Sequence, residues 1–337
     1  MEYILSQLKN LLSIPSPSGF TRKVTEYLVA ELKNLGYEPY VTNKGSVGVC
    51  LGGEGNPILL GAHVDTLGGM VAEIKSSGAL RITNIGGLMA TNVETENCVI
   101  FTRDGHSYTG VCQLENASSH VNSEAREAKR TFSTVEVLID EVVESKEDVK
   151  KLGISVGDYV CFDPRTVITE SGYIKSRFLD DKLSAAILLG YAKRLKDAGK
   201  QPARRVYLYF TTYEEVGHGG ASGMPEGLNE ILAVDMGCVG TGLECKETQV
   251  SICAKDSSGP SDYEFTTRLI NTAKAQGIDY AVDVYPSYSS DMDVALRSGI
   301  DAAHCVVGSG VYASHGYERT HMNGVKGTLK LIESYIG

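Results

Sequence analysis

Two adjacent carboxylates, Glu214 and Glu215, follow the apolar run 206–210 and are the residues of this sequence best suited to chemistry. Acidic groups at the end of a buried strand are costly unless positive charge compensates them. Neighbouring residues of an extended chain point to different sides, so one carboxylate can bind a metal ion while the other faces a substrate water. The pair therefore predicts a metal ligand beside a general base.

His63 and Asp65 occupy a comparable position after the apolar run 58–62. Residues two apart in extended chain share a side, so the Asp65 carboxylate can fix the tautomer of a metal-bound His63 imidazole. Taken alone, a His-x-Asp sequence is equally consistent with a purely structural role.

Asp180 and Asp181 open a predicted helix, and Asp235 follows the apolar run 231–234. Acids at a helix start are usually an ordinary cap favoured by the helix dipole. The functional interpretation is that one of the two aspartates bridges two metal ions.

Two late histidines, His315 and His321, complete the set, and either could be a ligand. Two histidines, three carboxylates and a spare base are what a pair of divalent cations about 3.5–4 Å apart requires. The charges of Asp180, Glu215, Asp235 and one hydroxide would balance two such cations.

The elements that must position these residues alternate between strand and helix. Such alternation predicts an α/β fold with a mixed, mostly parallel sheet flanked by helices, and ligands bind such sheets at the carboxyl ends of the strands. The predicted strands are 58–62, 206–210, 231–234, 281–285 and 303–307, and the predicted helices are 180–195, 261–275 and 325–336.

A different pattern fills residues 68–165, where short alternating or β-branched runs are separated by Gly, Asn, Asp and Ser. We expect an inserted small β-rich domain there, with an exposed loop at 115–130. The catalytic domain would then comprise residues 1–67 plus 166–337.

Composition excludes several classes of function. The 337 residues include 42 acidic and 32 basic side chains, a net charge of −10, which argues against nucleic acid or an anionic membrane as partner. No apolar run reaches the roughly 18 residues of a membrane span, and the amphipathic first twelve residues do not resemble a secretory signal. The eight scattered cysteines suit buried thiols in a reducing compartment, so we expect a cytoplasmic protein.

Two other functions compete with metal-dependent hydrolysis. A glycoside hydrolase could use Glu214 with a second carboxylate and would need no transition metal. A non-catalytic binding or assembly protein could retain the fold, but it predicts a broken ligand set, whereas every position here is filled.

Five motifs, taken in order, resemble the M42 family of metallo-aminopeptidases, which includes tetrahedral, self-compartmentalising enzymes. Residues 144–164 also resemble the stretch that closes the family's inserted domain. The motifs are His63-Val64-Asp65, Leu179-Asp180-Asp181-Lys182, Glu214-Glu215-Val216-Gly217, Val234-Asp235-Met236-Gly237 and a late histidine.

The resemblance implies a metal-dependent aminopeptidase that releases N-terminal residues from peptides through a water bridging two divalent metals. His63, Asp180 and Asp235 would bind one metal, and Asp180, Glu215 and the late histidine the other. We prefer His315 for that histidine, because the residues after it fit related metallopeptidases better, although the family's His-Ser-Pro motif is absent here.

The same resemblance assigns Glu214 as general base and Asp65 as the residue that orients His63. It also implies a homo-oligomer, often a dodecamer, built on the inserted domain. Histidine and carboxylate ligands suit Zn²⁺ or Co²⁺, and also Mn²⁺.

Overall fold

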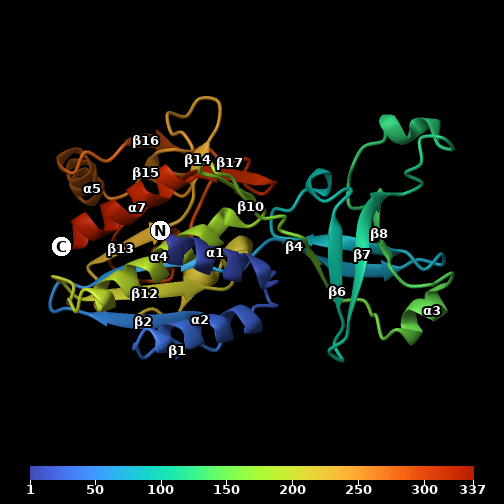
Figure 1. Cartoon of the computed structure of the whole chain (residues 1–337), viewed down its shortest axis with the longest axis horizontal. Helices are drawn as coiled ribbons and strands as arrows, with labels where there is room; N and C mark the ends of the chain where they lie inside the picture. The colour runs from blue at the N-terminus through green and yellow to red at the C-terminus, as the bar shows by residue number, and fades with distance from the viewer. The chain divides into compact units, whose positions relative to one another are not determined.

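The computed structural model describes residues 1–337, which fall into two compact units (Figure 1). Unit 1 comprises Met1–Thr66 and Arg165–Gly337, and unit 2 is the continuous segment Leu67–Pro164. The second unit is therefore inserted into the chain of the first.

Unit 1 is built on a sheet in which β12, β3, β13 and β17 lie next to one another and run parallel. β2 joins this core antiparallel to β12, and β15 joins antiparallel to β17. The predicted mixed, mostly parallel sheet is confirmed. Its strands are β1 (Tyr40–Val41), β2 (Val47–Gly52), β3 (Ile58–His63), β10 (Val167–Ile168), β11 (Tyr173–Ser176), β12 (Val206–Thr211), β13 (Glu230–Val234), β14 (Gly237–Val239), β15 (Val250–Lys255), β16 (Tyr280–Val284), β17 (Ala303–Tyr312) and β18 (Glu318–His321).

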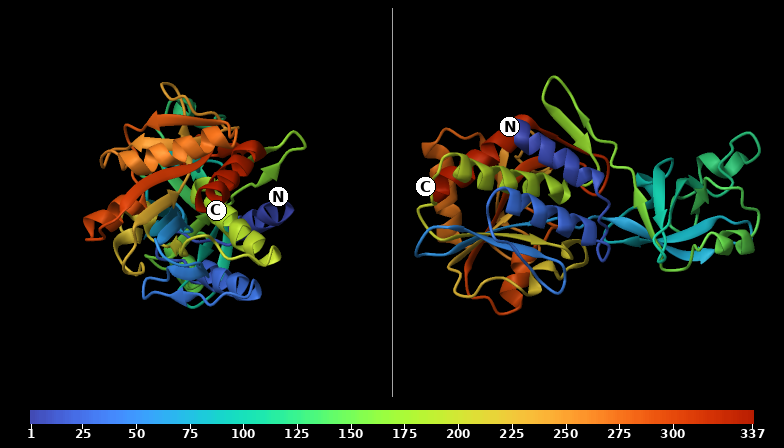
Figure 2. Two further views of the ribbon diagram at one scale, coloured as in Figure 1. Left: turned by 90° about the vertical axis from the view of Figure 1, so that its left-hand side faces the viewer. Right: turned by 60° about the horizontal axis from the view of Figure 1, so that its bottom comes forward.

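Helices cover both faces of this sheet, and α1, α4 and α7 pack side by side on one of them (Figures 1 and 2). Alternate residues of one strand enter different cores, because successive side chains of a strand point to opposite faces. Leu60 lies in the core beneath α4, whereas Leu59 packs with Met292 of α6. The helices are α1 (Glu2–Ser13), α2 (Arg22–Asn34), α4 (Leu179–Asp197), α5 (Tyr263–Ala275), α6 (Asp291–Arg297) and α7 (Met322–Ile336), with short 3-10 turns η3 (Glu214–Val216) and η4 (Gly219–Ala221).

Unit 2 is a closed antiparallel barrel with strand order β4-β5-β8-β7-β6-β9, as expected for a β-rich insertion. Val71, Ile82, Ile100 and Val160 are at most 1% exposed and fill its interior. The elements are β4 (Gly68–Ile74), β5 (Leu80–Ile85), η1 (Ala90–Asn92), β6 (Asn97–Phe101), β7 (Ser107–Leu114), η2 (Ser123–Arg126), β8 (Val135–Ile139), α3 (Lys146–Lys151) and β9 (Tyr159–Phe162).

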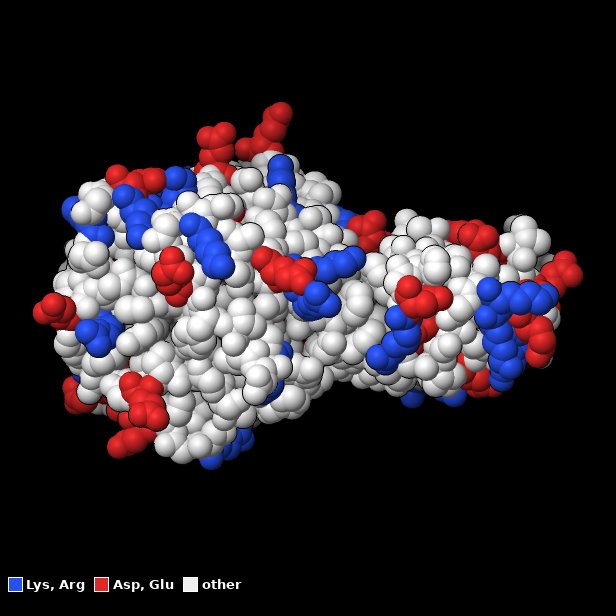
Figure 3. Space-filling model, turned by 90° about the horizontal axis from the view of Figure 1, so that it is seen from below, with Lys and Arg blue, Asp and Glu red and all other residues white.

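Acidic and basic side chains are interspersed on the face drawn in Figure 3, which carries no continuous basic stripe. All eight cysteines are free thiols, and six of them are buried. None of the helices combines the length and the apolar character that crossing a bilayer would require.

Candidate active site

The carboxyl ends of β3, β12 and β13 lie at one edge of the sheet. Thr211 at the end of β12 pairs with His63 at the end of β3, and β13 runs parallel to β3 on its other side. Residues that follow these strands therefore come together, although they lie far apart in the chain. Glu214 and Asp235 both come close to His63 in this way.

One group at this edge consists of His63, Asp180 and Asp235, whose potential ligand atoms all lie within 4.8 Å of one another. His63 Nε2 is 3.0 Å from Asp180 Oδ1, and all three residues are buried. Burial and the charge of Asp180 raise the pKa of Asp235 to about 7. Burial alone would lower the pKa of His63, but its carboxylate neighbours raise it well above the usual value.

A second group consists of Asp180, Glu215 and His315, again with ligand atoms within 4.8 Å. His315 Nε2 lies 3.5 Å from Glu215 Oε2 and 3.7 Å from Asp180 Oδ2. Asp180 thus belongs to both groups, and its two oxygens face the two different histidines. This is the arrangement that a bridging carboxylate requires.

Glu214 lies beside the first group, with Oε2 3.8 Å from His63 Nε2. Burial raises the pKa of Glu214 well above the usual carboxyl value, and the negative charges of Asp291, Asp235 and Asp180 act in the same direction. A raised pKa favours a carboxyl group that both accepts and donates a proton during a reaction.

Asp65 is fully buried and holds the loop that carries the two glutamates. Its carboxylate accepts the backbone N–H groups of Glu214 at 3.1 Å and Glu215 at 3.3 Å, and also the Ser18 hydroxyl at 2.5 Å. Asp65 Oδ1 also lies 3.6 Å from His63 Nδ1. The nearer partner of His63 Nδ1 is the backbone carbonyl oxygen of Asp65 at 3.0 Å. The orienting role of the Asp65 carboxylate stays a prediction, and its contacts to the glutamate loop were not predicted.

Asp181 turns away from its neighbour Asp180. It is fully buried, and its Oδ2 accepts the backbone N–H of His63 at 3.3 Å. It therefore links the end of β3 to the start of α4, and it is in neither of the two ligand groups.

Glu318 is a residue of this site that the sequence reasoning missed. It is 2% exposed, and its two oxygens accept the backbone N–H groups of Asp180 and His315, each at 3.0 Å. Burial and the charge of Asp180 raise the pKa of Glu318. An acid three residues after a candidate histidine ligand was the only signal in the sequence.

The two late histidines lie in different surroundings. His321 Nε2 is 2.9 Å from the Ser171 carbonyl oxygen, and its Nδ1 accepts the Asn323 N–H at the start of α7. His321 is thus an N-cap of α7, while His315 faces the carboxylates.

The donor set fits a pair of divalent cations. Imidazole nitrogens and carboxylate oxygens are common ligands of Zn²⁺, Co²⁺ and Mn²⁺. Burial and the charge of Asp180 raise the pKa of both Glu215 and Asp235. The site therefore holds too little positive charge to balance its carboxylates. Two cations would supply it.

Comparison with known proteins agrees with this geometry. A family model described as M42 glutamyl aminopeptidase matches residues 45–331. YhfE of Bacillus subtilis (strain 168), named as an aminopeptidase, is 42% identical over 331 residues, covering 98% of this chain and 96% of that protein. The glutamyl aminopeptidase of Lactococcus lactis subsp. cremoris (strain MG1363) is 26% identical over 239 residues, which cover 70% of this chain and 66% of that protein.

Among solved structures, the fold matches the TET1 peptidase of Pyrococcus horikoshii, which can assemble into a tetrahedron or a large octahedral shell. The TM-score is 0.86 at 23% identity, with 99% of each chain covered. The family model matches most of the chain, and the Bacillus relative is similar to it over nearly its whole length. This chain therefore belongs to the M42 family of aminopeptidases.

Proposed function

We propose that this aminopeptidase removes N-terminal residues from peptides at the carboxyl edge of its parallel sheet. His63, Asp180 and Asp235 would hold one divalent cation, and Asp180, Glu215 and His315 a second. One observation carries the proposal, namely that the oxygens of Asp180 face His63 and His315 separately.

When bound, two divalent cations supply Lewis acidity for the scissile carbonyl and bring the pKa of a water molecule close to neutrality. Zn²⁺ and Co²⁺ are the ions that we propose, with Mn²⁺ compatible with the same ligands.

Glu214 would act as the proton carrier. Its carboxylate accepts a proton from the attacking water and later donates one to the leaving amine, a role that its raised pKa favours. Asp65 positions Glu214 through the backbone N–H, and it faces the imidazole of His63 from the side away from Asp180.

The alternatives are weaker. A glycoside hydrolase needs two carboxylates and no imidazole ligands, whereas histidines interleave with the acids here. A non-catalytic assembly protein would have no need for a carboxyl group with a raised pKa beside two groups of potential metal ligands.

Replacing Glu214 by Gln tests the mechanism. We expect the bound metal per chain to be unchanged and turnover of aminoacyl amides to fall by about 10²–10⁴, the usual contribution of a general base. The exposed Glu226→Gln is the matched control, since it makes the same chemical change away from the cluster. Near wild-type turnover by Glu214→Gln would contradict the role of Glu214.

We also propose that the protein is cytoplasmic and assembles as a homo-oligomer through unit 2. The assemblies of the TET1 peptidase of Pyrococcus horikoshii support this. Light scattering of the purified protein should give a mass well above the 36.2 kDa of one chain, about twelve times larger for a dodecamer. A monomer mass at micromolar concentration would contradict the proposal.

A further inference from the structure

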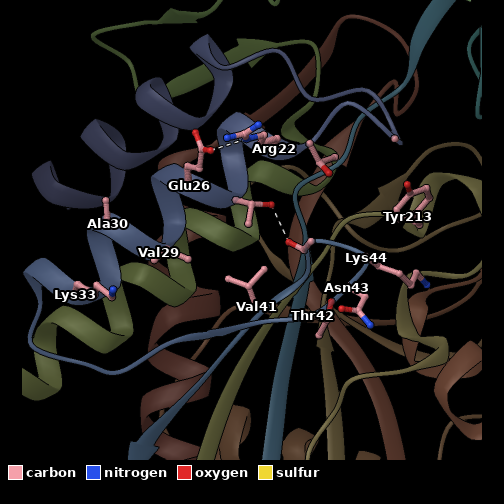
Figure 4. Close-up of a pocket in the computed structure, with 14 residues that line it drawn as sticks. Arg22, Glu26, Val29, Ala30, Lys33, Val41, Thr42, Asn43, Lys44 and Tyr213 are labelled. Atoms are coloured by element: carbon pink, nitrogen blue, oxygen red, sulfur yellow. Dashed lines mark hydrogen bonds and ion pairs between the residues drawn. The ribbon is translucent and has the colours of Figure 1, made fainter.

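A groove with a volume of about 700 Å³ lies between α2 and the segment that joins β1 to β2 (Figure 4). Val29 and Val41 give it an apolar surface, and Lys33 and Lys44 add positive charge from its two sides. Tyr213 contributes the aromatic ring at the end where Lys44 lies.

This groove borders the candidate active site. Tyr213 lines it and directly precedes Glu214 in the chain. Gly19 also lines it and directly follows Ser18, whose hydroxyl donates to Asp65. The groove therefore begins beside the two acids that we propose to carry and to position the proton.

The proposed reaction indicates which part of a bound peptide would lie in the groove. Glu214 donates a proton to the leaving amine, so the part of the peptide beyond the scissile bond must lie on the side of Glu214. A peptide that leaves the site on this side meets the end of the groove at Tyr213.

The length of the groove suits a short peptide. Arg22 and Lys33, eleven residues apart on α2, both line it. At a rise of 1.5 Å per residue they are separated by about 16 Å along the helix axis. An extended chain advances about 3.3 Å per residue, so the groove accommodates about five residues.

The charges of the groove suit an anionic chain end. Arg22 is paired with Glu26 at 2.8 Å, which leaves Lys33 and Lys44 as its other cations. The Lys44 ammonium donates to the His218 carbonyl and lies 5.5 Å from the centroid of the Tyr213 ring. An ammonium has three donors, so Lys44 retains hydrogen-bonding capacity for a ligand.

We propose that this groove binds the carboxyl-side part of short peptide substrates. Lys44 would recognise the terminal carboxylate of the shortest peptides at the Tyr213 end, and Lys33 that of longer peptides at the other end. The inference rests on the proposed function and adds a substrate class to it, namely peptides of roughly three to six residues with a free carboxyl end.

The test compares each peptide of three to six residues with its C-terminal carboxamide. For the wild-type protein we expect kcat/KM to be about two- to five-fold higher for the free acid, the effect of one exposed ion pair. The difference should appear mainly in KM. The double variant Lys33→Met with Lys44→Met should bring the acid-to-amide ratio to about one, and Lys44→Arg alone should retain it.

Lys200→Met is the matched control, because Lys200 is exposed and does not line the groove. The ratio is measured within one protein preparation, so a partly misfolded variant does not distort it. Equal rates for acid and amide in the wild-type protein, or an unchanged ratio in the double variant, would overturn the inference.

Aminoacyl p-nitroanilides separate this inference from the proposed function, since they have no peptide chain to enter the groove. If a panel of them is hydrolysed while the acid-to-amide ratio is one, only the groove inference fails. If neither they nor the peptides are hydrolysed by the metal-loaded protein, the proposed function fails as well.

Discussion

Replacing Glu318 by Gln should lower both the stability of the fold and the affinity for metal. The two oxygens of Glu318 accept backbone N–H groups from Asp180 on α4 and from His315 on the loop after β17. A glutamine has one amide oxygen and one NH₂ group, so one backbone N–H would face another donor. The change therefore removes one acceptor at the point where two proposed ligands are held together.

The magnitude follows from these contacts. Loss of a hydrogen bond to a charged acceptor costs about 1.5–3 kcal/mol, and a buried N–H without a partner costs about 1–3 kcal/mol. These costs overlap, so we expect the free energy of unfolding of the metal-free protein to fall by about 2–4 kcal/mol. Metal affinity should fall by about 10–100-fold, as for other residues that orient metal ligands.

Urea denaturation measures the first effect, and calorimetric titration with Zn²⁺ the second. Glu54→Gln is the matched control, since Glu54 is exposed on the loop after β2. If Glu318→Gln matched the control in both measurements, Glu318 would have no positioning role.

Three further predictions concern other parts of the molecule. His315→Ala should lower the bound divalent metal to about one ion per chain, whereas His321→Ala should leave it at two. Elemental analysis measures the bound metal, and the reverse result would make His321 the ligand in place of His315. Burial and the neighbouring Asp293 raise the pKa of Asp256 from 3.8 to about 6. The stabilising proton on Asp256 is therefore lost as the pH rises from about 4 through 6, and the free energy of unfolding should fall across that window. The pKa of Asp293 is lowered, so its own contribution is lost only at more acidic pH. Urea titrations at several pH values check this, and an equally steep decline in Asp256→Asn would exclude the Asp256 proton as its cause. Glu230 is 6% exposed and binds Arg204, Arg268 and Tyr335, so Glu230→Ala should destabilise the protein by about 3 kcal/mol. A loss below about 0.5 kcal/mol, the level of an ordinary surface change, would show that this cluster adds little.

The central strands could be predicted from the sequence, because parallel strands buried on both faces appear as continuous apolar runs. Strand β17 is longer than the predicted 303–307 and extends to Tyr312. Gly308 and Gly310 interrupt its apolar pattern. A Cβ at Gly308 would collide with the Asp235 carbonyl, and one at Gly310 with the Lys246 carbonyl. The glycines therefore allow close backbone approach within a strand and do not mark a turn.

Strand β7 of the barrel is hard to predict from the sequence for a similar reason. Its segment Ser107–Leu114 alternates polar and apolar residues around Gly110. A Cβ at Gly110 would lie 2.5 Å from the Leu138 carbonyl oxygen on the paired strand β8. The glycine is needed for strand pairing, but in the sequence it looks like a strand end.

The candidate ligands could be predicted because each follows a strand or begins a helix at the same edge of the sheet. The contacts that hold them could not. Glu318 and Asp180 are 138 residues apart in the chain, and Asp65 lies 149 residues from Glu214. Only the folded chain brings such pairs together, and no local spacing signals them.

Metal titration of chelated protein tests the central claim most directly. We predict that chelated protein does not release N-terminal residues from peptides, and that Zn²⁺ or Co²⁺ restores turnover with saturation near two ions per chain. His315→Ala should lose one of these ions. Full turnover after complete chelation, or saturation below one ion per chain, would contradict a two-cation site at the carboxyl edge of the sheet.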